Sequence, residues 1–205
     1  MSPTSETRYS FANYLSLARW SSFYYQLRTI LRLVPETMLE VGGGSGVVGD
    51  YLKNHTRIHY QSLDLNPTLH PDLVGDVRQI PAADRAFDLI AVFEVLEHLP
   101  FNDFERTLVE LKRVARHYVF LSLPDARSHL RFSIKIPLLP RLQFALKIPF
   151  PRRHRPHPEH FWEVGERGFS NQRLVKIMRR HFKLREQFIP YENQSHHFYL
   201  LEKND

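Results

Sequence analysis

Cysteine is absent from the 205 residues of this chain. The absence excludes disulfide bonds, thiolate metal sites, iron–sulfur clusters held by cysteine, and catalysis through a cysteine nucleophile. Long apolar runs are also lacking, because no segment reaches the roughly 18 uncharged apolar residues that a membrane-spanning helix needs. The first residues show no apolar core of a secretory signal. We therefore expect a cytoplasmic protein without thiol chemistry.

Acidic residues are missing from one stretch, residues 126–158. Eight basic residues lie there and account for the net charge of +6, since the remainder of the chain is slightly acidic. Leucine, isoleucine and phenylalanine alternate with these cations, and six prolines break the stretch into short pieces. Three interpretations stay open: a lid over a substrate pocket, a basic amphipathic surface that rests on anionic lipid, and an RNA-binding patch.

Glycine is scarce, with eight in the chain, yet three stand in a row at positions 42–44. A short apolar run, residues 38–41, precedes them and predicts a buried strand, and a helix-like spacing begins at Val47. A strand, glycine turn and helix in this order place a ligand against backbone N–H groups at a helix N-terminus. The dinucleotide fingerprint G-x-G-x-x-G would need glycine where Val47 stands, so a nicotinamide dehydrogenase is disfavoured.

The acid and glycines of this turn have a distinctive spacing. Glu40, Gly42, Gly44 and Gly46 resemble motif I, (D/E)-x-G-x-G-x-G, of the class I S-adenosylmethionine (SAM)-dependent methyltransferases. The resemblance implies an α/β, Rossmann-like, doubly wound sheet of seven mainly parallel strands with an antiparallel last strand and helices on both faces. It also implies SAM as the methyl donor and S-adenosylhomocysteine (SAH) as the product. Strand and helix signals that alternate from residue 38 to 124 independently favour a parallel sheet.

The chain is expected to form a single domain over residues 1–205. Its parts are N-terminal helices (1–35), a SAM-binding core (36–125), the basic and apolar insertion or lid (126–160), and a C-terminal helix and hairpin (161–205). The Trp20-Ser21-Ser22 step predicts two N-terminal helices. Helices are predicted to begin at Asn102, with Glu105 completing a capping box, and at Ser170-Asn171. The remaining strands are predicted at 58–65, 72–77, 87–93, 117–123, 184–189 and 196–201.

Acidic side chains follow two of the predicted strands, where open α/β sheets bind ligands. Asp64 ends the second strand, and its carboxylate can accept hydrogen bonds from both ribose hydroxyls of an adenosine. By the resemblance, Asp76 and Val77 lie where the family reads the adenine edge. The predicted cofactor-binding residues are Glu40, Gly42, Gly43, Gly44, Asp64, Leu65, Asp76, Val77, Phe93 and Glu94.

The run Glu94-Val95-Leu96-Glu97-His98 follows the fourth strand. Amino-methyltransferases carry (N/D)-P-P-(Y/F) there, so an oxygen acceptor is favoured, and His98 is the predicted catalytic residue. The pattern resembles that of O-methyltransferases of ubiquinone biosynthesis and of small-RNA 2′-O-methyltransferases, in which a metal also takes a later histidine. His160 resembles that histidine. We assign no metal ligand, and leave open whether Glu94, Glu97, His98 and His160 hold a divalent ion.

These observations predict a SAM-dependent methyltransferase that acts on an oxygen of a small or lipid-linked molecule. Peripheral contact of residues 126–158 with a membrane is compatible with their composition, and nucleic acid is disfavoured as a partner. The alternatives are an RNA 2′-O-methyltransferase with a metal at the E-x-x-E-H run, and a SAM-binding module without catalysis.

Overall fold

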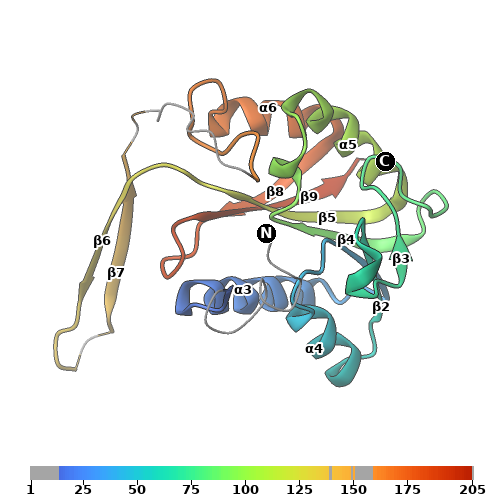
Figure 1. The fold of residues 1–205 in the computed structure, drawn as a ribbon. Helices are drawn as coiled ribbons and strands as arrows, with labels where there is room; N and C mark the ends of the chain where they lie inside the picture. Colours follow the sequence, from blue (N-terminus) through green and yellow to red (C-terminus); the bar gives the residue numbers. More distant parts are fainter. Residues whose placement is uncertain (1–13, 139, 149, 151–158, 205) are drawn as a thin grey trace.

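A computed structural model describes residues 14–138, 140–148, 150 and 159–204. Its centre is a seven-stranded sheet in the order β3-β2-β1-β4-β5-β9-β8, with helices on both faces (Figure 1). The first five strands in this order run parallel, and β9 is antiparallel to β5 and to β8. The predicted fold is therefore confirmed. The strands are β1 (Thr37–Val41), β2 (His59–Asp64), β3 (Leu73–Val74), β4 (Phe87–Phe93), β5 (Ala115–Pro124), β8 (Phe182–Phe188) and β9 (His196–Lys203).

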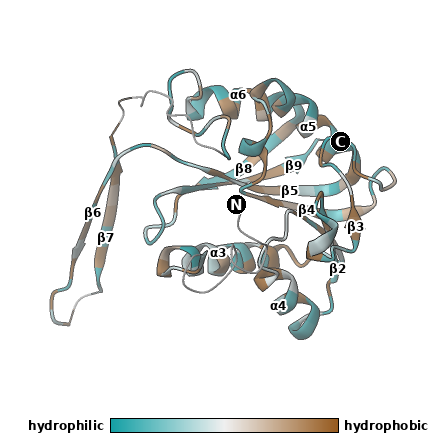
Figure 2. Cartoon of the chain, viewed as in Figure 1, coloured by the Kyte–Doolittle hydropathy of each residue, from teal (hydrophilic) through white to brown (hydrophobic). Residues whose placement is uncertain are grey.

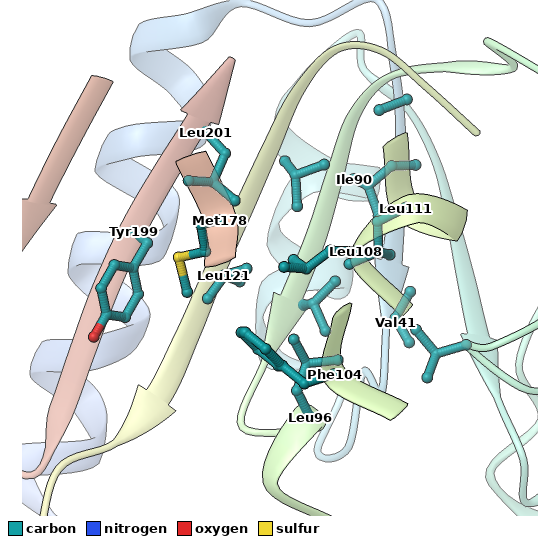
Figure 3. Packing of buried hydrophobic residues seen from close by; sticks show 14 of the residues in the cluster. Val41, Ile90, Leu96, Phe104, Leu108, Leu111, Leu121, Met178, Tyr199 and Leu201 are labelled. Carbon is teal, nitrogen blue, oxygen red and sulfur yellow. The ribbon is translucent and has the colours of Figure 1, made fainter. Parts of the chain in front are cut away.

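The central strand β4 is buried along its whole length, as its continuous apolar run predicts. On one face, helices α5 (Phe101–Val114) and α6 (Asn171–His181) pack over the sheet, and Figure 3 shows Phe104, Leu108 and Met178 meeting strand residues such as Leu121. On the other face lie α3 (Leu17–Leu33) and α4 (Val47–His55). The helices on both faces hold the parallel strands in place, and with them the carboxyl ends of β1, β2 and β4.

The predicted boundary between two helices at Trp20-Ser21-Ser22 is wrong. Helix α3 runs through Trp20-Ser21-Ser22 without a break. The two serines do not end it because their hydroxyls donate back to the carbonyl of Ala18, at 2.7 Å from Ser21 and 3.5 Å from Ser22. Ser16 caps its start by accepting from the backbone N–H of Arg19.

Helix α5 begins differently from the prediction. Pro100 occupies the N-cap and Asn102 lies inside the first turn, so the predicted capping box is wrong. Glu105 instead accepts from Arg180 at 3.0 Å and lies 3.0 Å from Nε2 of His181, which ties α5 to α6. The predicted cap of α6 is confirmed, because Ser170 accepts from the backbone N–H of Arg173.

The third strand is shorter than predicted. Only Leu73 and Val74 pair with β2, and the chain turns at Asp76, whose carbonyl accepts from the N–H of Gln79. Asp76 therefore lies beyond the strand, in a turn that is joined to Gln79 by a single bridge.

Residues 126–148 leave the body as a two-stranded antiparallel hairpin, β6 (His129–Ile134) and β7 (Leu142–Lys147). It stands apart from the main sheet (Figure 1) and carries alternating hydrophobic and hydrophilic residues (Figure 2). Over the described residues, no helix combines the length and the apolar character needed to cross a bilayer. Part of the basic insertion, residues 151–158, lies outside the described residues.

Candidate active site

The turn after β1 needs glycine at its first position. Gly42 has φ +72°, in the left-handed region, and a Cβ on it would lie 2.4 Å from Cγ2 of Val95. Its N–H donates to the carbonyl of Leu63 at 2.8 Å, which fixes the turn to the end of β2. Gly46, at φ +75°, then starts α4. The absence of a side chain at Gly42 thus lets the backbone of this turn approach Val95, just after β4.

A cavity of about 200 Å³ opens at the carboxyl ends of β1, β2 and β4. Six of the predicted site residues line it: Gly42, Asp64, Leu65, Val77, Glu94 and His98. Gly43 and Gly44 line an adjoining cavity of about 150 Å³ beside α4, and Asp64 borders both. The Asp64 carboxylate also accepts from the N–H of Asn66 at 2.8 Å, which holds the side chain at the end of the strand. The sheet therefore gathers these residues from separate parts of the sequence.

Glu40 lies beneath the glycine turn and is nearly inaccessible to solvent. Its carboxylate accepts a 2.6 Å hydrogen bond from the hydroxyl of Tyr60. Burial raises the pKa of Glu40 to about 7, even though the Tyr60 hydrogen bond favours the ionised form. Glu40 lines neither cavity, so its contacts in this structure are with the protein beneath the turn.

Two other predicted cofactor residues lie outside the linings. Asp76 pairs with Arg78, whose Nη2 lies 2.6 Å away, and these hydrogen bonds hold the pKa of Asp76 below its ordinary value. Arg78 also contacts Asp103 at 3.1 Å. Phe93 is buried at the end of β4 and packs edge-on against Phe120. The backbone next to these two residues borders the cavity through Val77 and Glu94.

Glu94 connects this cavity to a larger one. Its backbone is left-handed, at φ +53°, which is uncommon for a residue with a Cβ. One carboxylate oxygen accepts from the Ser122 hydroxyl at 2.7 Å, and the other lies 3.6 Å from Nε2 of His196. Glu94 lines the 200 Å³ cavity and also a cavity of about 590 Å³ on the other side. The larger cavity is lined by Arg19, Glu94, Pro124, Asp125, Ala126, Arg127, Ser128, His129, His160, Glu163, Ser195 and His196.

Glu97, His98 and His160 form a cluster in which one ligand atom from each lies within 4.8 Å of the others. Glu97 is fully buried, and neither of its carboxylate oxygens has a hydrogen-bond partner among the described residues. His98 Nδ1 lies 2.7 Å from the carbonyl of Glu159, so this nitrogen donates and the lone pair of a neutral ring is on Nε2. His160 Nδ1 lies 2.7 Å from the Glu163 carboxylate, which gives the same tautomer.

The local backbone separates Glu94 from this cluster. A single 3₁₀ turn, η2 (Leu96–His98), covers only part of the run, and Glu94 precedes it. Glu94 therefore meets Ser122 and His196, while Glu97 joins His98 and His160. The run would share one face only if it were helical throughout, and the turn is too short to bring i and i+4 together.

The segment that supplies His160 is anchored to the body. Trp162 is fully buried, and its indole N–H donates to the carbonyl of Leu99 at 3.0 Å. The N–H of Phe161 donates to the carbonyl of Glu97 at 2.8 Å. These two bonds hold residues 160–162 against the turn after β4, which explains how a histidine 62 positions after His98 reaches it.

Comparison with known proteins connects this geometry to a family. Residues 39–122 match the model of a family described as "Methyltransferase domain". The match spans the glycine turn, the acid at the end of β2, and the run after β4. Residues 39–122 of this chain are therefore a SAM-dependent methyltransferase domain. SAM is therefore its methyl donor, and SAH its product.

Solved structures share the fold of this methyltransferase at low sequence identity. The PH0226 protein of Pyrococcus horikoshii OT3 is 10% identical over 96% of both chains, with a TM-score of 0.61. The Burkholderia thailandensis 1,6-didemethyltoxoflavin-N1-methyltransferase, solved with SAH, is 14% identical over 93% of this chain and 79% of its own, with a TM-score of 0.60. The small RNA methyltransferase HEN1 is 16% identical with a TM-score of 0.62, over 91% of this chain but 25% of its own. No curated protein sequence matches significantly.

Sequence reasoning missed one buried residue that lines the larger cavity. His196 opens β9, is almost fully buried, and lines the 590 Å³ cavity. Its Nδ1 lies 3.1 Å from the Ser22 hydroxyl, which in turn accepts from Asn193 at 2.9 Å. The consecutive histidines 196 and 197 at the start of a strand were the available signal. The antiparallel placement of β9 beside β5 brings His196 to this cavity.

Proposed function

We propose that this methyltransferase transfers the SAM methyl group to an oxygen of a small or lipid-linked molecule, and that residues 1–205 act as one domain. The observation that carries the proposal is the pair of cavities that share Glu94 as a common wall. SAM bound on the glycine side would present its methyl group toward Glu94, and an acceptor in the 590 Å³ cavity would approach from the other side. Methyl transfer requires this in-line arrangement.

The proposed cofactor site keeps the predicted residues, with roles that follow from their positions. Asp64 would accept the ribose hydroxyls, and the glycine turn would pass under the methionine part of SAM. Val77 and Leu65 border the cavity on the side where the adenine would lie. Glu40 and Phe93 would act through the backbone that they hold, and Asp76 would need to loosen its pairing with Arg78 to meet a ligand.

His98 is the proposed general base. The carbonyl of Glu159 accepts from its Nδ1, which leaves the basic lone pair on Nε2. In the reaction, the acceptor oxygen would form a bond to the methyl carbon as the carbon–sulfur bond of SAM breaks. The hydroxyl proton would pass to Nε2 of His98, which lines the cofactor cavity and packs against His160 of the acceptor cavity. SAH would leave neutral at sulfur.

An oxygen acceptor is favoured by the residues after β4 rather than by the structural neighbours. The (N/D)-P-P-(Y/F) signature of amino-methyltransferases is replaced by Glu94-Val95-Leu96-Glu97. By its name, the toxoflavin-pathway neighbour methylates a nitrogen. A panel of hydroxyl and amine acceptors incubated with methyl-labelled SAM would separate the two classes, and labelling of amines alone would overturn the oxygen proposal.

The cofactor proposal is tested by calorimetric titration with SAM, SAH and NAD. Micromolar binding of SAM and SAH without NAD binding is the expected result, and Asp64→Ala should weaken it. The exposed Asp84 lies outside both proposed cavities, and Asp84→Ala is the control. SAM binding without methyl transfer to any acceptor would instead support a module without catalysis.

A second candidate is methylation of a hydroxyl with the help of a divalent metal ion, as in an RNA 2′-O-methyltransferase. The observation that favours it is the buried Glu97 carboxylate without a hydrogen-bond partner among the described residues, beside two histidines whose lone pairs are on Nε2. Each Nδ1 donates to a carbonyl or carboxylate, which is the usual arrangement behind a metal-binding histidine. Glu97, His98 and His160 would hold the ion, which would acidify a bound hydroxyl.

This candidate is tested by titrating the protein with Mn²⁺, followed by electron paramagnetic resonance. Glu97→Gln and His160→Gln should abolish binding, while His117→Gln, a change at an exposed histidine of β5, should not. Absence of Mn²⁺ binding to the wild-type protein would leave His98 as the base. Methylation of a small RNA but of no lipid would favour the RNA alternative.

A further inference from the structure

The hairpin β6–β7 has one face that is entirely apolar. Residues directly opposite each other in an antiparallel pair point to the same face, and the register pairs Leu130 with Leu146, Phe132 with Phe144, and Ile134 with Leu142. The two phenylalanine rings stack with centroids 5.2 Å apart. All six side chains are 43–58% exposed. Such a contiguous exposed apolar surface marks an interaction site.

The opposite face of the hairpin is polar and turns toward the body near its base. Arg131 donates to the carbonyls of Tyr191 and Glu192, in the loop between β8 and β9. Lys147 donates to the carbonyl of Gln194 in the same loop and lies 3.4 Å from the buried carboxylate of Asp125. Since the polar side chains reach the body, the apolar face is turned outward.

The far end of the hairpin extends the apolar face and surrounds it with positive charge. Ile136 is 47% exposed, and Leu138 is fully exposed at a left-handed backbone position. Lys135 and Arg141 flank them and are exposed as well. Because residues 126–158 hold no acidic residue, every charge that this segment itself brings to the apolar end is positive.

We propose that the β6–β7 hairpin is a membrane-binding element that inserts its apolar face and tip into the surface of an anionic bilayer. Apolar side chains bordered by cations match the acyl and phosphate layers of such a surface. The distance of the tip from the main sheet (Figure 1) lets it enter the lipid without burying the body. A second copy of the chain fits less well, since two hairpins would bring their cations together with no acid on either. RNA also fits less well, since the two aromatic rings of this face, Phe132 and Phe144, stack on each other and its other four side chains are leucine or isoleucine.

The hairpin joins the body beside the proposed acceptor cavity. Its base, residues 126–129, forms one wall of the 590 Å³ cavity. A bilayer bound along the hairpin would therefore lie next to that cavity, and an acceptor attached to a lipid could enter it without leaving the membrane. This second step depends on the proposed methyl transfer, whereas membrane binding itself does not.

The experiment is vesicle flotation of the full chain, with phosphatidylcholine vesicles and with vesicles that also contain phosphatidylglycerol. We expect binding to the anionic vesicles alone, and a loss of binding on raising the salt concentration. Phe132→Ser/Phe144→Ser should weaken the partition coefficient by roughly a hundredfold, because two half-exposed rings no longer enter the lipid. Tyr24→Ser/Tyr51→Ser removes two equally exposed aromatic side chains outside the hairpin and should change little.

A charge-reversed pair tests the electrostatic part. Lys135→Glu/Arg141→Glu should reduce binding to the anionic vesicles by roughly tenfold or more, and Arg57→Glu/Arg179→Glu, at exposed positions of the body, should have a much smaller effect. Unchanged melting temperatures would show that the variants fold.

Three outcomes would overturn the proposal. The first is failure of the wild-type protein to float with anionic vesicles. The second is flotation that the hairpin variants do not alter. The third is a dimer in light scattering that Phe132→Ser/Phe144→Ser converts to monomer, which would assign the apolar face to a second copy. SAM binding measured on the same preparations distinguishes these failures from a failure of the proposed methyl transfer.

Discussion

Strands β4 and β6 have opposite surroundings. Strand β4 is FDLIAVF, and all seven residues are buried between two layers of helices. Strand β6 is HLRFSI, and all six are exposed. In β4 six of the seven residues are apolar and the last five are consecutive, whereas in β6 three apolar residues alternate with three polar ones. A continuous apolar run is typical of a strand covered on both faces, and alternation is typical of a strand with one apolar face.

The largest expected change in stability comes from comparing two isoleucines, one in each strand. Ile90 in β4 is fully buried and Ile134 in β6 is 50% exposed. Ile90→Ala should lower the free energy of unfolding by about 2–5 kcal/mol through lost contacts and a cavity. Ile134→Ala should lower it by less than about 1 kcal/mol while weakening vesicle binding. Urea denaturation measures both, and equal losses of stability would show that the hairpin face is covered.

The base of the hairpin is where the two regions meet. The Asp125 side chain is buried and lies 2.5 Å from Arg127, 3.4 Å from Lys147 and 3.5 Å from His197. Burial opposes its ionisation, but the nearby His197 ring, the hydrogen bonds from Arg127 and the charge of Lys147 prevail and hold the pKa of Asp125 well below its usual range. Asp125→Asn should cost about 3 kcal/mol of stability, since it leaves buried cations unpaired.

Hydrogen exchange distinguishes a local effect of Asp125→Asn on the hairpin from a loss of stability in the whole fold. Asp125→Asn should increase amide hydrogen exchange in β6 and β7 while β1 and β4 keep their protection. Uniform acceleration through the central sheet would show that Asp125 supports the whole fold rather than the hairpin.

Glu40 is a polar exception within the buried sheet, and it predicts a pH dependence. Its folded-state pKa, about 7, lies above the value of 4.5 in an unfolded chain. Between these values the folded state binds more protons, so the free energy of unfolding should fall as the pH rises from about 4.5 to 7, by up to roughly 3 kcal/mol. Glu40→Gln should remove this slope in urea titrations at successive pH values. Glu36→Gln, at an exposed position, should preserve it.

The smallest expected effect on stability is for Asp64, at the end of β2. Asp64→Ala should weaken SAM binding by about 1–3 kcal/mol through the loss of two hydroxyl contacts, with little change in stability because the side chain is partly exposed. Calorimetry measures the affinity and thermal melting the stability. A large drop in melting temperature with unchanged SAM affinity would assign Asp64 to the fold.

Elements with a local sequence signal could be predicted, and elements that depend on tertiary contacts could not. The glycine turn and β4 carry local signals, and Ser170 at the start of α6 is a local cap. The unbroken α3 could not be predicted from Trp20-Ser21-Ser22, because serines can bond back to their own helix. In β6 and β7 apolar and polar residues alternate, which is a strand signal. The prolines between and after these two segments favoured a broken chain instead.

The candidate site was only partly predictable for a related reason. Glycine spacing and strand-end acids are local, and the cavity gathers Gly42, Asp64 and Glu94 as expected. The contact between Glu97 and His160 depends on a backbone hydrogen bond from Phe161 and on the burial of Trp162, which are tertiary. The place of His196 depends on sheet order, which no spacing along the chain encodes.

The sheet order has a consequence for how the protein is made. Strand β9 lies between β5 and β8, and among the described strands it is the only neighbour of β8. During vectorial synthesis on a ribosome, β8 emerges before the strand that pairs with it, and the exposed edge of β5 waits for the same segment. The sheet can therefore close only after β9 has left the exit tunnel. Until then, nascent chains would present two open β-edges, the feature that draws chaperones and promotes aggregation.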